Sequence, residues 1–231
     1  MDREIIRSKD FVRAAAGFIL GVGRQALSER GEFRIALSGG NTPRPVYQEV
    51  AQAGETPWEK VLITFSDERC VPPEDEQSNY RMARESLFEP AAVPAESILR
   101  MPGEIEPETA AREYEAKLDA LAIARGEKIY RHDLILLGMG DDGHTASLFP
   151  GTAALAETNR RVVANFVPKF NSCRLTFTFP LINEARHVCF LVNAGKHAEL
   201  IERVLQGDAQ YPAARIAPTA GKLTWILGQA A

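Results

Sequence analysis

The stretch DLILLGMGDDGH, residues 133–144, joins an apolar run to a loop rich in glycine and aspartate. The residues from Leu134 to Leu137 are all apolar, and a short run of this kind before a turn is typical of a strand buried on both faces. Strands of this type occur in parallel sheets that carry helices on each side. The stretch therefore indicates an α/β fold with a polar loop at the carboxyl end of a central strand.

Further apolar runs alternate with amphipathic segments along the rest of the chain. We expect strands near residues 33–37, 61–65, 134–137, 161–167, 174–179, 187–193 and 223–227, and helices near 10–28, 43–53, 79–88, 107–125 and 196–205. Ser8 is the expected N-cap of the first helix. This order predicts a three-layer, Rossmann-like α/β fold, with a mostly parallel sheet and helices on both faces. With no repeat or linker, we expect a single domain over residues 1–231.

The composition excludes several classes of protein. A net charge of −4 and a pI of about 5.7 give no basic field for nucleic acid or an anionic membrane. The three cysteines form no Cys-x-x-Cys pair, which argues against zinc and redox motifs. The beginning of the chain lacks a signal-peptide pattern, and its apolar run AAAGFILGVG is too short to span a bilayer. We expect a cytoplasmic protein, as a monomer or alternatively a homodimer.

The loop SGGNTP, residues 38–43, follows the expected strand 33–37 and precedes a helix. Thr42 is a suitable N-cap and Pro43 suits the first helical position. The glycines allow a tight turn whose N–H groups point outward, and a helix N-terminus attracts anions. We expect phosphate contacts at Gly39, Gly40, Asn41 and Thr42. The alternative is a plain turn with a good cap, and no Gly-Lys-Ser/Thr follows, so this is not a Walker loop.

The loop after the central strand matches the dinucleotide pattern Gly138-x-Gly140-x-x-Gly143. Asp141 and Asp142 fill its variable positions and would repel a pyrophosphate, and no acidic residue ends the following strand. We therefore expect no nicotinamide, flavin or other cofactor. The glycines are better suited to presenting His144, a natural general base, with Asp142 to orient its ring. Two alternatives remain: His144 caps a helix beginning at TASLF, or the loop binds a metal, although no second histidine has ligand spacing.

Charged residues also follow other expected strands. Asp67, Glu68 and Arg69 come directly after one strand, Lys196 begins a late helix, and Arg174 begins a strand. Taken singly, such residues are most often surface charges. Ligands bind at the carboxyl ends of parallel strands, so together with SGGNTP they predict a local positive pocket in an acidic protein.

These segments resemble, in this order, the 6-phosphogluconolactonase family over nearly the whole chain. The matching stretches are LSGGNTP (37–43), SDERCVPPEDEQSNYRMARESLF (66–88), DLILLGMGDDGHTASLFPGT (133–152), RLTFTFPLIN (174–183) and NAGKHAELIERVL (193–205). The resemblance implies the fold of the glucosamine-6-phosphate deaminases. It also implies a carboxylic-ester hydrolase that converts 6-phospho-D-glucono-1,5-lactone to 6-phosphogluconate, the second step of the oxidative pentose phosphate pathway, without metal or cofactor.

The resemblance also implies roles for individual residues. His144 is similar to the base that activates water, with Asp142 as its partner, and Asp67, which belongs to the family pattern, is the third candidate catalytic residue. The implied substrate and phosphate contacts are Gly39, Gly40, Asn41, Thr42, Arg69, Arg174 and Lys196.

Three other functions remain open from the sequence. The related deaminases resemble DGHIAFNEP and need a carboxylate shortly after the histidine, whereas here no Asp or Glu lies between His144 and Glu157. A sugar-phosphate sensor on the same fold would bind without catalysis, and the chain carries no DNA-binding segment. A metal-dependent lactonase is the last alternative. The departure from the deaminase pattern favours the lactonase.

Overall fold

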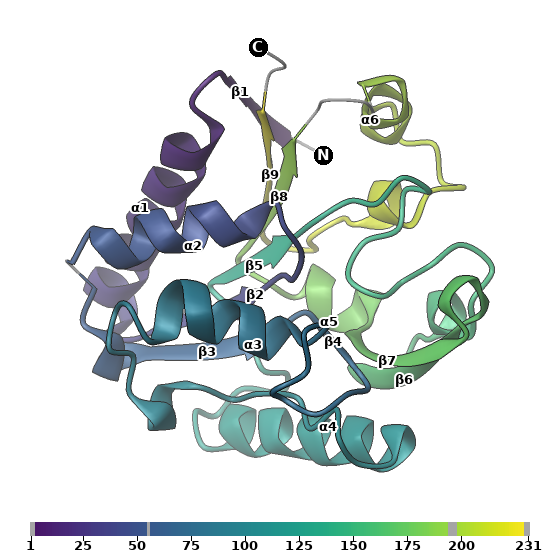
Figure 1. The fold of residues 1–231 in the computed structure, drawn as a ribbon, viewed down its shortest axis with the longest axis horizontal. Helices are drawn as coiled ribbons and strands as arrows, with labels where there is room; N and C mark the ends of the chain where they lie inside the picture. Colours follow the sequence, from purple (N-terminus) through teal and green to yellow (C-terminus); the bar gives the residue numbers. More distant parts are fainter. Residues whose placement is uncertain (1–2, 55, 194–197, 229–231) are drawn as a thin grey trace.

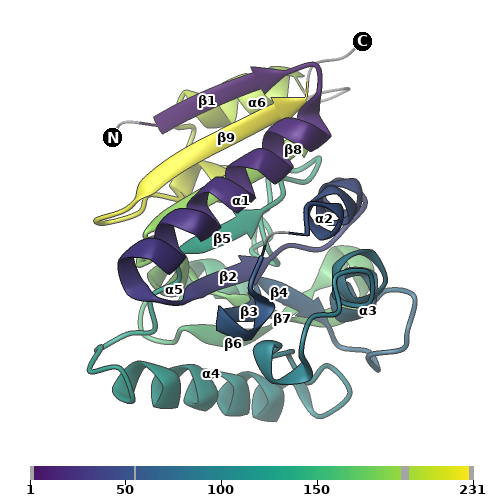
Figure 2. The same ribbon diagram turned by 90° about the vertical axis from the view of Figure 1, so that its left-hand side faces the viewer.

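The computed structural model describes residues 3–54, 56–193 and 198–228. Its main sheet has six parallel strands (Figure 2). From edge to edge they are β1 (Arg3–Ser8), β9 (Lys222–Gly228), β8 (His187–Asn193), β5 (Leu134–Leu137), β2 (Phe33–Leu37) and β3 (Val61–Phe65). The predicted α/β class with a mostly parallel sheet is confirmed.

The core lies on both faces of this sheet because successive side chains of β5 point in opposite directions. Leu134 and Leu136 join one apolar cluster, and Ile135 and Leu137 join the other. The first cluster includes α1 (Phe11–Arg30), α2 (Pro43–Gln52) and α3 (Asn79–Ala83); the second includes α4 (Pro107–Ile123), α5 (Phe179–Asn183) and α6 (Ala198–Leu205) (Figure 1). No helix in the described ranges is both long and apolar enough to cross a bilayer.

A second, antiparallel sheet was not predicted as a separate unit. It has the order β4 (Asp67–Arg69), β7 (Ser172–Phe177) and β6 (Val162–Val167). The segment 67–69, expected as a loop, is thus a strand, too short to show a pattern in the sequence. Ser66 joins the two sheets, since its N–H donates to Leu37 O at 2.9 Å and its carbonyl accepts from Phe177 N at 2.8 Å.

The N-terminal segment also differs from the prediction. Residues Arg3–Ser8 form edge strand β1, whose largely exposed side chains give no buried apolar run to recognise. Ser8 is therefore not the helix cap. Helix α1 begins at Phe11, and the carboxylate of Asp10 accepts the N–H of Arg13 at 3.2 Å. Likewise the side chain of Thr42 does not cap α2, although Pro43 begins that helix as expected.

The topology creates a crevice between β2 and β5, which are neighbours in the sheet. The chain leaving β2 enters α2, which packs in the first cluster. The chain leaving β5 instead reaches Leu148 and Ala154, which pack in the second cluster on the other face. Loops that diverge in this way leave room at the carboxyl ends of the strands, where ligands bind in open α/β sheets.

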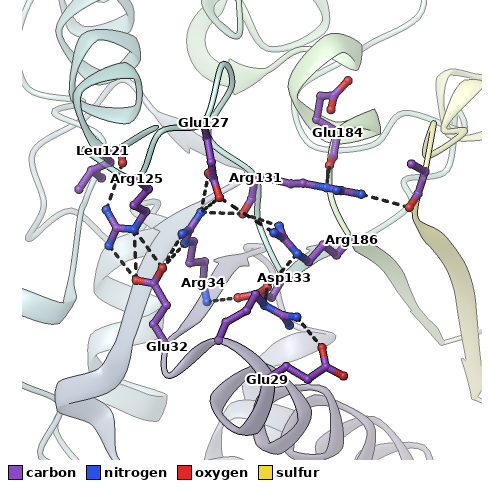
Figure 3. A network of polar contacts seen from close by, with 12 residues as sticks. Glu29, Glu32, Arg34, Leu121, Arg125, Glu127, Arg131, Asp133, Glu184 and Arg186 are labelled. Atoms are coloured by element: carbon purple, nitrogen blue, oxygen red, sulfur yellow. Dashed lines mark hydrogen bonds and ion pairs between the residues drawn. The ribbon is translucent and has the colours of Figure 1, made fainter. Parts of the chain in front are cut away.

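A network of ion pairs lies at the opposite, amino ends of β2 and β5 (Figure 3). The guanidinium of buried Arg34 pairs with Glu32 and, at 2.7 Å, with Glu127. The carboxylate of Asp133 accepts the backbone N–H of Arg34 at 2.8 Å and the guanidinium of Arg30 at 2.9 Å. These contacts join the start of both strands to the end of α1.

The network makes a prediction about stability. Hydrogen bonds from Arg125 and then Arg34 outweigh burial and lower the pKa of Glu32 from 4.5 to about 2. Since this pKa is depressed in the folded state, the stabilisation is present above about pH 4.5 and lost as the pH falls toward 2. We expect Glu32→Gln to lower the Tm by about 2 to 4 °C at pH 7. Thermal melts at pH 3 should show a smaller difference in Tm between Glu32→Gln and wild type. Glu59→Gln, at an exposed position, is the control. An equally large difference in Tm at pH 3 would contradict a lowered pKa of Glu32.

Candidate active site

A cleft of about 760 Å³ opens at the carboxyl ends of the strands. The loops after β2 and β5 line it together with the end of β8 and with β4 and β7. Most of the residues predicted for the site line this cleft: Gly39, Gly40, Asn41, Thr42, Asp67, Arg69, His144 and Arg174. Asp142 lies behind the ring of His144 and contacts it, whereas Lys196 lies outside the described residues.

The loop after β5 fixes the imidazole of His144 against a carboxylate. Nδ1 of His144 lies 2.5 Å from Oδ1 of Asp142, which also accepts the backbone N–H of His144 at 3.1 Å. Nε2 of His144 has no hydrogen-bond partner among the described residues. The chain from Thr145 onward forms turns rather than a helix, so the helix-capping interpretation of His144 is wrong.

The glycine at position 140 is explained by the imidazole ring. A Cβ added at Gly140 would lie 2.0 Å from Cε1 of His144 and 2.2 Å from its Nδ1. The Phe149 ring stacks on the same imidazole, with a centroid separation of 3.9 Å and an interplanar angle of 22°. The glycine of the apparent dinucleotide pattern therefore makes room for a histidine.

Lys169 completes this arrangement and was not singled out from the sequence. Its ammonium lies 2.9 Å from Oδ1 of Asp141 and 3.2 Å from Oδ2 of Asp142. Burial opposes ionisation of Asp142, but the hydrogen bond and charge of His144, aided by Lys169, hold the pKa of Asp142 below its ordinary value. Asp142 is therefore a carboxylate with both oxygens engaged. Lys169 lies in a hairpin distant in sequence, where a lone lysine gives no signal.

Asp67 is buried at the edge of the cleft and is held by two side chains. The hydroxyl of Ser147 donates to Oδ2 of Asp67 at 2.7 Å, and the amide of Asn79 donates to its Oδ1 at 3.3 Å. The amide of Asn79 fills the space above Gly39, where an added Cβ would lie 1.8 Å from its Oδ1. Gly39 thus makes room for Asn79, a residue that sequence reasoning missed because it begins an ordinary helix.

Glu68 has a structural place instead. Its carboxylate accepts backbone N–H groups of Arg69, Asn79 and Tyr80 at 2.7 to 2.8 Å, and the hydroxyl of Ser78 at 3.2 Å. Burial raises its pKa, and the backbone hydrogen bonds oppose this rise. Glu68 anchors the start of α3 and does not line the cleft.

Two arginines face each other across the second sheet. Arg69 and Arg174 are direct partners in the antiparallel pair of β4 and β7, and both line the cleft. Burial, and then the charge of Arg69, lower the pKa of Arg174. Like charges opposite each other destabilise a sheet, and an anion between them would relieve the repulsion. The pair is therefore suited to binding a phosphate.

The loop 38–43 offers backbone donors to the same cleft. Gly40 has a φ of +97°, in the region that favours glycine. The N–H groups of Gly40, Asn41 and Thr42 have no hydrogen-bond partner within the described part of the chain. Below them, the Tyr47 hydroxyl accepts the N–H of Ser38 at 3.0 Å and donates to its carbonyl at 2.8 Å, which fixes the loop. Free N–H groups at a helix N-terminus favour anions.

The fold and the cleft define an α/β protein that gathers an imidazole, a buried carboxylate and two arginines around a cleft at the carboxyl ends of its parallel strands. Residues 7–225 match the model of the family described as glucosamine-6-phosphate isomerases/6-phosphogluconolactonase. The chain belongs to this family.

Individual relatives agree with this membership. The chain is 43% identical over 211 residues to a curated 6-phosphogluconolactonase of Synechocystis, covering 90% of this chain and 86% of the relative. It is 39% identical over 210 residues to a 6-phosphogluconolactonase of Nostoc, covering 89% and 86%. The crystal structure of a 6-phosphogluconolactonase from Thermotoga maritima matches with a TM-score of 0.86 at 28% identity, covering 99% of this chain and 100% of that one.

The packing of His144 on Gly140 predicts different outcomes for two glycines of one loop. Gly140→Ala should displace the imidazole because its Cβ would overlap the ring, whereas Gly138→Ala meets no atom within 4 Å. We expect NOEs between the rings of His144 and Phe149 to disappear in Gly140→Ala and to persist in Gly138→Ala. Equal NOEs in both variants would show that the ring does not depend on this space.

Proposed function

We propose that this chain is a carboxylic-ester hydrolase that opens 6-phospho-D-glucono-1,5-lactone to 6-phosphogluconate, the second step of the oxidative pentose phosphate pathway. The observation that carries the proposal is the imidazole of His144, which lines the cleft, binds Asp142 through Nδ1 and has no partner for Nε2 in the part of the chain that the structure describes. Arg69 and Arg174 line the same cleft and supply positive charge for the phosphate.

His144 acts as the general base for water. The carboxylate of Asp142 at 2.5 Å keeps the proton on Nδ1, so the lone pair is on Nε2. Nε2 accepts a proton from water as the water oxygen forms a bond to the lactone carbonyl carbon. The negative charge of Asp142 stabilises the imidazolium that results, as a carboxylate partner does for other catalytic histidines.

The tetrahedral intermediate then collapses, and the bond between the carbonyl carbon and the ring oxygen breaks. The imidazolium of His144 returns its proton to the departing ring oxygen, which becomes a hydroxyl of the open-chain product. A lactone is an activated ester, so one base and a fixed substrate suffice, without metal or cofactor. No serine nucleophile is required: the hydroxyl of Ser147 already donates to Asp67.

The remaining predicted residues hold the substrate in this proposal. Arg69, Arg174 and the loop donors of Gly40, Asn41 and Thr42 bind the phosphate, with Gly39 giving space for Asn79. Lys196 stays a predicted phosphate contact outside the described residues. Asp67, the third catalytic candidate, lines the cleft, where its carboxylate accepts a hydrogen bond from a sugar hydroxyl.

We propose that the chain works as a single domain and as a monomer in the cytoplasm. The three cysteines are free thiols, which suits a reducing compartment. The deaminase activity of the wider family is not favoured, because the segment after His144 lacks a carboxylate before Glu157.

Replacement of the base tests the reaction directly. We expect His144→Asn to lower kcat by about 10²- to 10⁴-fold while the fold is kept, because proton transfer by one side chain contributes on this scale. The lactone is generated in place from glucose 6-phosphate and its dehydrogenase, below neutral pH where spontaneous opening is slow, and its decay is followed.

Other outcomes separate the alternatives. Equal acceleration by wild type and His144→Asn would remove His144 from the role of base. No acceleration by wild type, with ammonia released from glucosamine 6-phosphate, would replace the lactonase by a deaminase. Tight binding of 6-phosphogluconate without acceleration would indicate a sensor, and loss of activity on chelation would indicate a metal enzyme.

The arginine pair gives a prediction about binding. We expect Arg174→Gln to raise the KM for the lactone by about 10- to 100-fold and to change kcat much less, because a charge-assisted hydrogen bond to phosphate is lost. Arg112→Gln, on the exposed surface of α4, is the control and should leave both constants unchanged. An unchanged KM in Arg174→Gln would exclude Arg174 from the phosphate site.

A further inference from the structure

The hairpin between β6 and β7 ends in a tip at the rim of the cleft. Pro168–Phe170 form one 3-10 turn, and Asn171 follows with a φ of +46°, in the left-handed region. This conformation closes the hairpin and directs two neighbouring residues to different parts of the site. Phe170 lines the cleft itself, and Lys169 reaches the loop after β5.

Lys169 contacts the acidic pair of that loop. Its Nζ lies 2.9 Å from Oδ1 of Asp141 and 3.2 Å from Oδ2 of Asp142. The other oxygen of Asp142 accepts from Nδ1 of His144. A carboxylate bound on one oxygen only can rotate about its bond to Cβ, whereas contacts on both oxygens hold its plane. The ammonium thus determines which way Asp142 faces.

We propose that Lys169 is a positioning residue, which holds the Asp142 carboxylate so that its Oδ1 stays against Nδ1 of His144 and its charge is shared between a lysine and a histidine. The proposal rests on the proposed role of His144 as the base. Lys169 does not itself line the cleft and touches no reacting atom, and it acts on His144 through Asp142.

The same tip contacts the imidazole through aromatic rings. Phe170 packs edge-to-face on Phe149 at a centroid distance of 5.7 Å, and Phe149 stacks on His144. The guanidinium of Arg174 lies 5.6 Å from the centroid of the Phe170 ring. The hairpin tip therefore contacts both ends of the proposed site, the base and the phosphate-binding pair.

The charges around His144 determine in which direction the loss of Lys169 should move its titration. The charged groups beside the Asp142–His144 pair are Asp141 on its own loop and Lys169 on the hairpin tip, and Arg174 on β7 lines the same cleft against the Phe170 ring. Removing the Lys169 cation leaves two carboxylates beside the imidazole and favours its protonated form. Near a protein surface, the loss of a unit charge this close to the His144 imidazole moves the midpoint of its titration by about 0.5 to 1 pH unit.

The test compares Lys169→Met and Lys169→Arg with wild type, and Lys128→Met serves as the matched control. Lys128 is exposed and precedes β5, at the opposite end of the strand from the site. Histidine ring signals are titrated by NMR, and the signal absent from His144→Asn is assigned to His144. His132 and His187 do not interfere, because burial lowers their pKa values to about 3 and about 4.

We expect Lys169→Met to move the midpoint of the His144 signal upward by about 0.5 to 1 pH unit. The acid limb of the kcat profile should move with it, and kcat above that limb should fall about three- to tenfold with little change in KM. Lys169→Arg should restore both, because it keeps the cation, and Lys128→Met should match wild type.

Two results would overturn the proposal. One is an unchanged His144 midpoint in Lys169→Met. The other is a loss of rate that Lys169→Arg fails to restore and that leaves the pH profile in place, as expected of damage to the hairpin. The NMR titration needs no substrate, so it judges Lys169 even if wild type fails to open the lactone and the proposed function is wrong.

Discussion

The burial of β5 on both faces is the constraint on which the molecule depends. Leu134 to Leu137 are all withdrawn from water, so neither face of the strand can carry a polar group. Along this part of the chain, polar side chains must therefore lie beyond the ends of β5. The amino end carries ion pairs around Arg34, and the carboxyl end carries the loop that presents His144. The groups that stabilise the fold and the candidate site therefore lie at opposite ends of the strands.

The parallel sheet could be predicted because buried strands leave a strong local signal. Strands β2, β3, β5 and β8 begin and end at the predicted residues. Two strands escaped prediction for different reasons. Strand β1 lies at an exposed edge, where mixed polar residues suffice, and β4 has only three residues, so no periodicity can develop. In the second sheet β4 pairs with β7, a segment distant in sequence, and no local pattern encodes that pairing.

The candidate site could be predicted in part for the same reason. Loops at the carboxyl ends of neighbouring strands must meet, so Asp67, Arg69 and His144 could be grouped from their positions alone. The supporting groups could not be found in this way. Asn79 and Lys169 reach the site from a helix and a hairpin tip, and what brings them there is tertiary packing. The glycines show the same division: their presence was evident, but the side chains they accommodate were not.

The ion-pair network at the amino ends of β2 and β5 has a consequence for how such a chain can change over time. Its members hold the start of the strands and touch none of the residues that line the cleft. Substitutions in this network change the stability of the fold without moving the residues that line the cleft. Adaptation to a hotter or saltier habitat can therefore proceed through this network while the loops beyond the opposite ends of the strands keep their geometry.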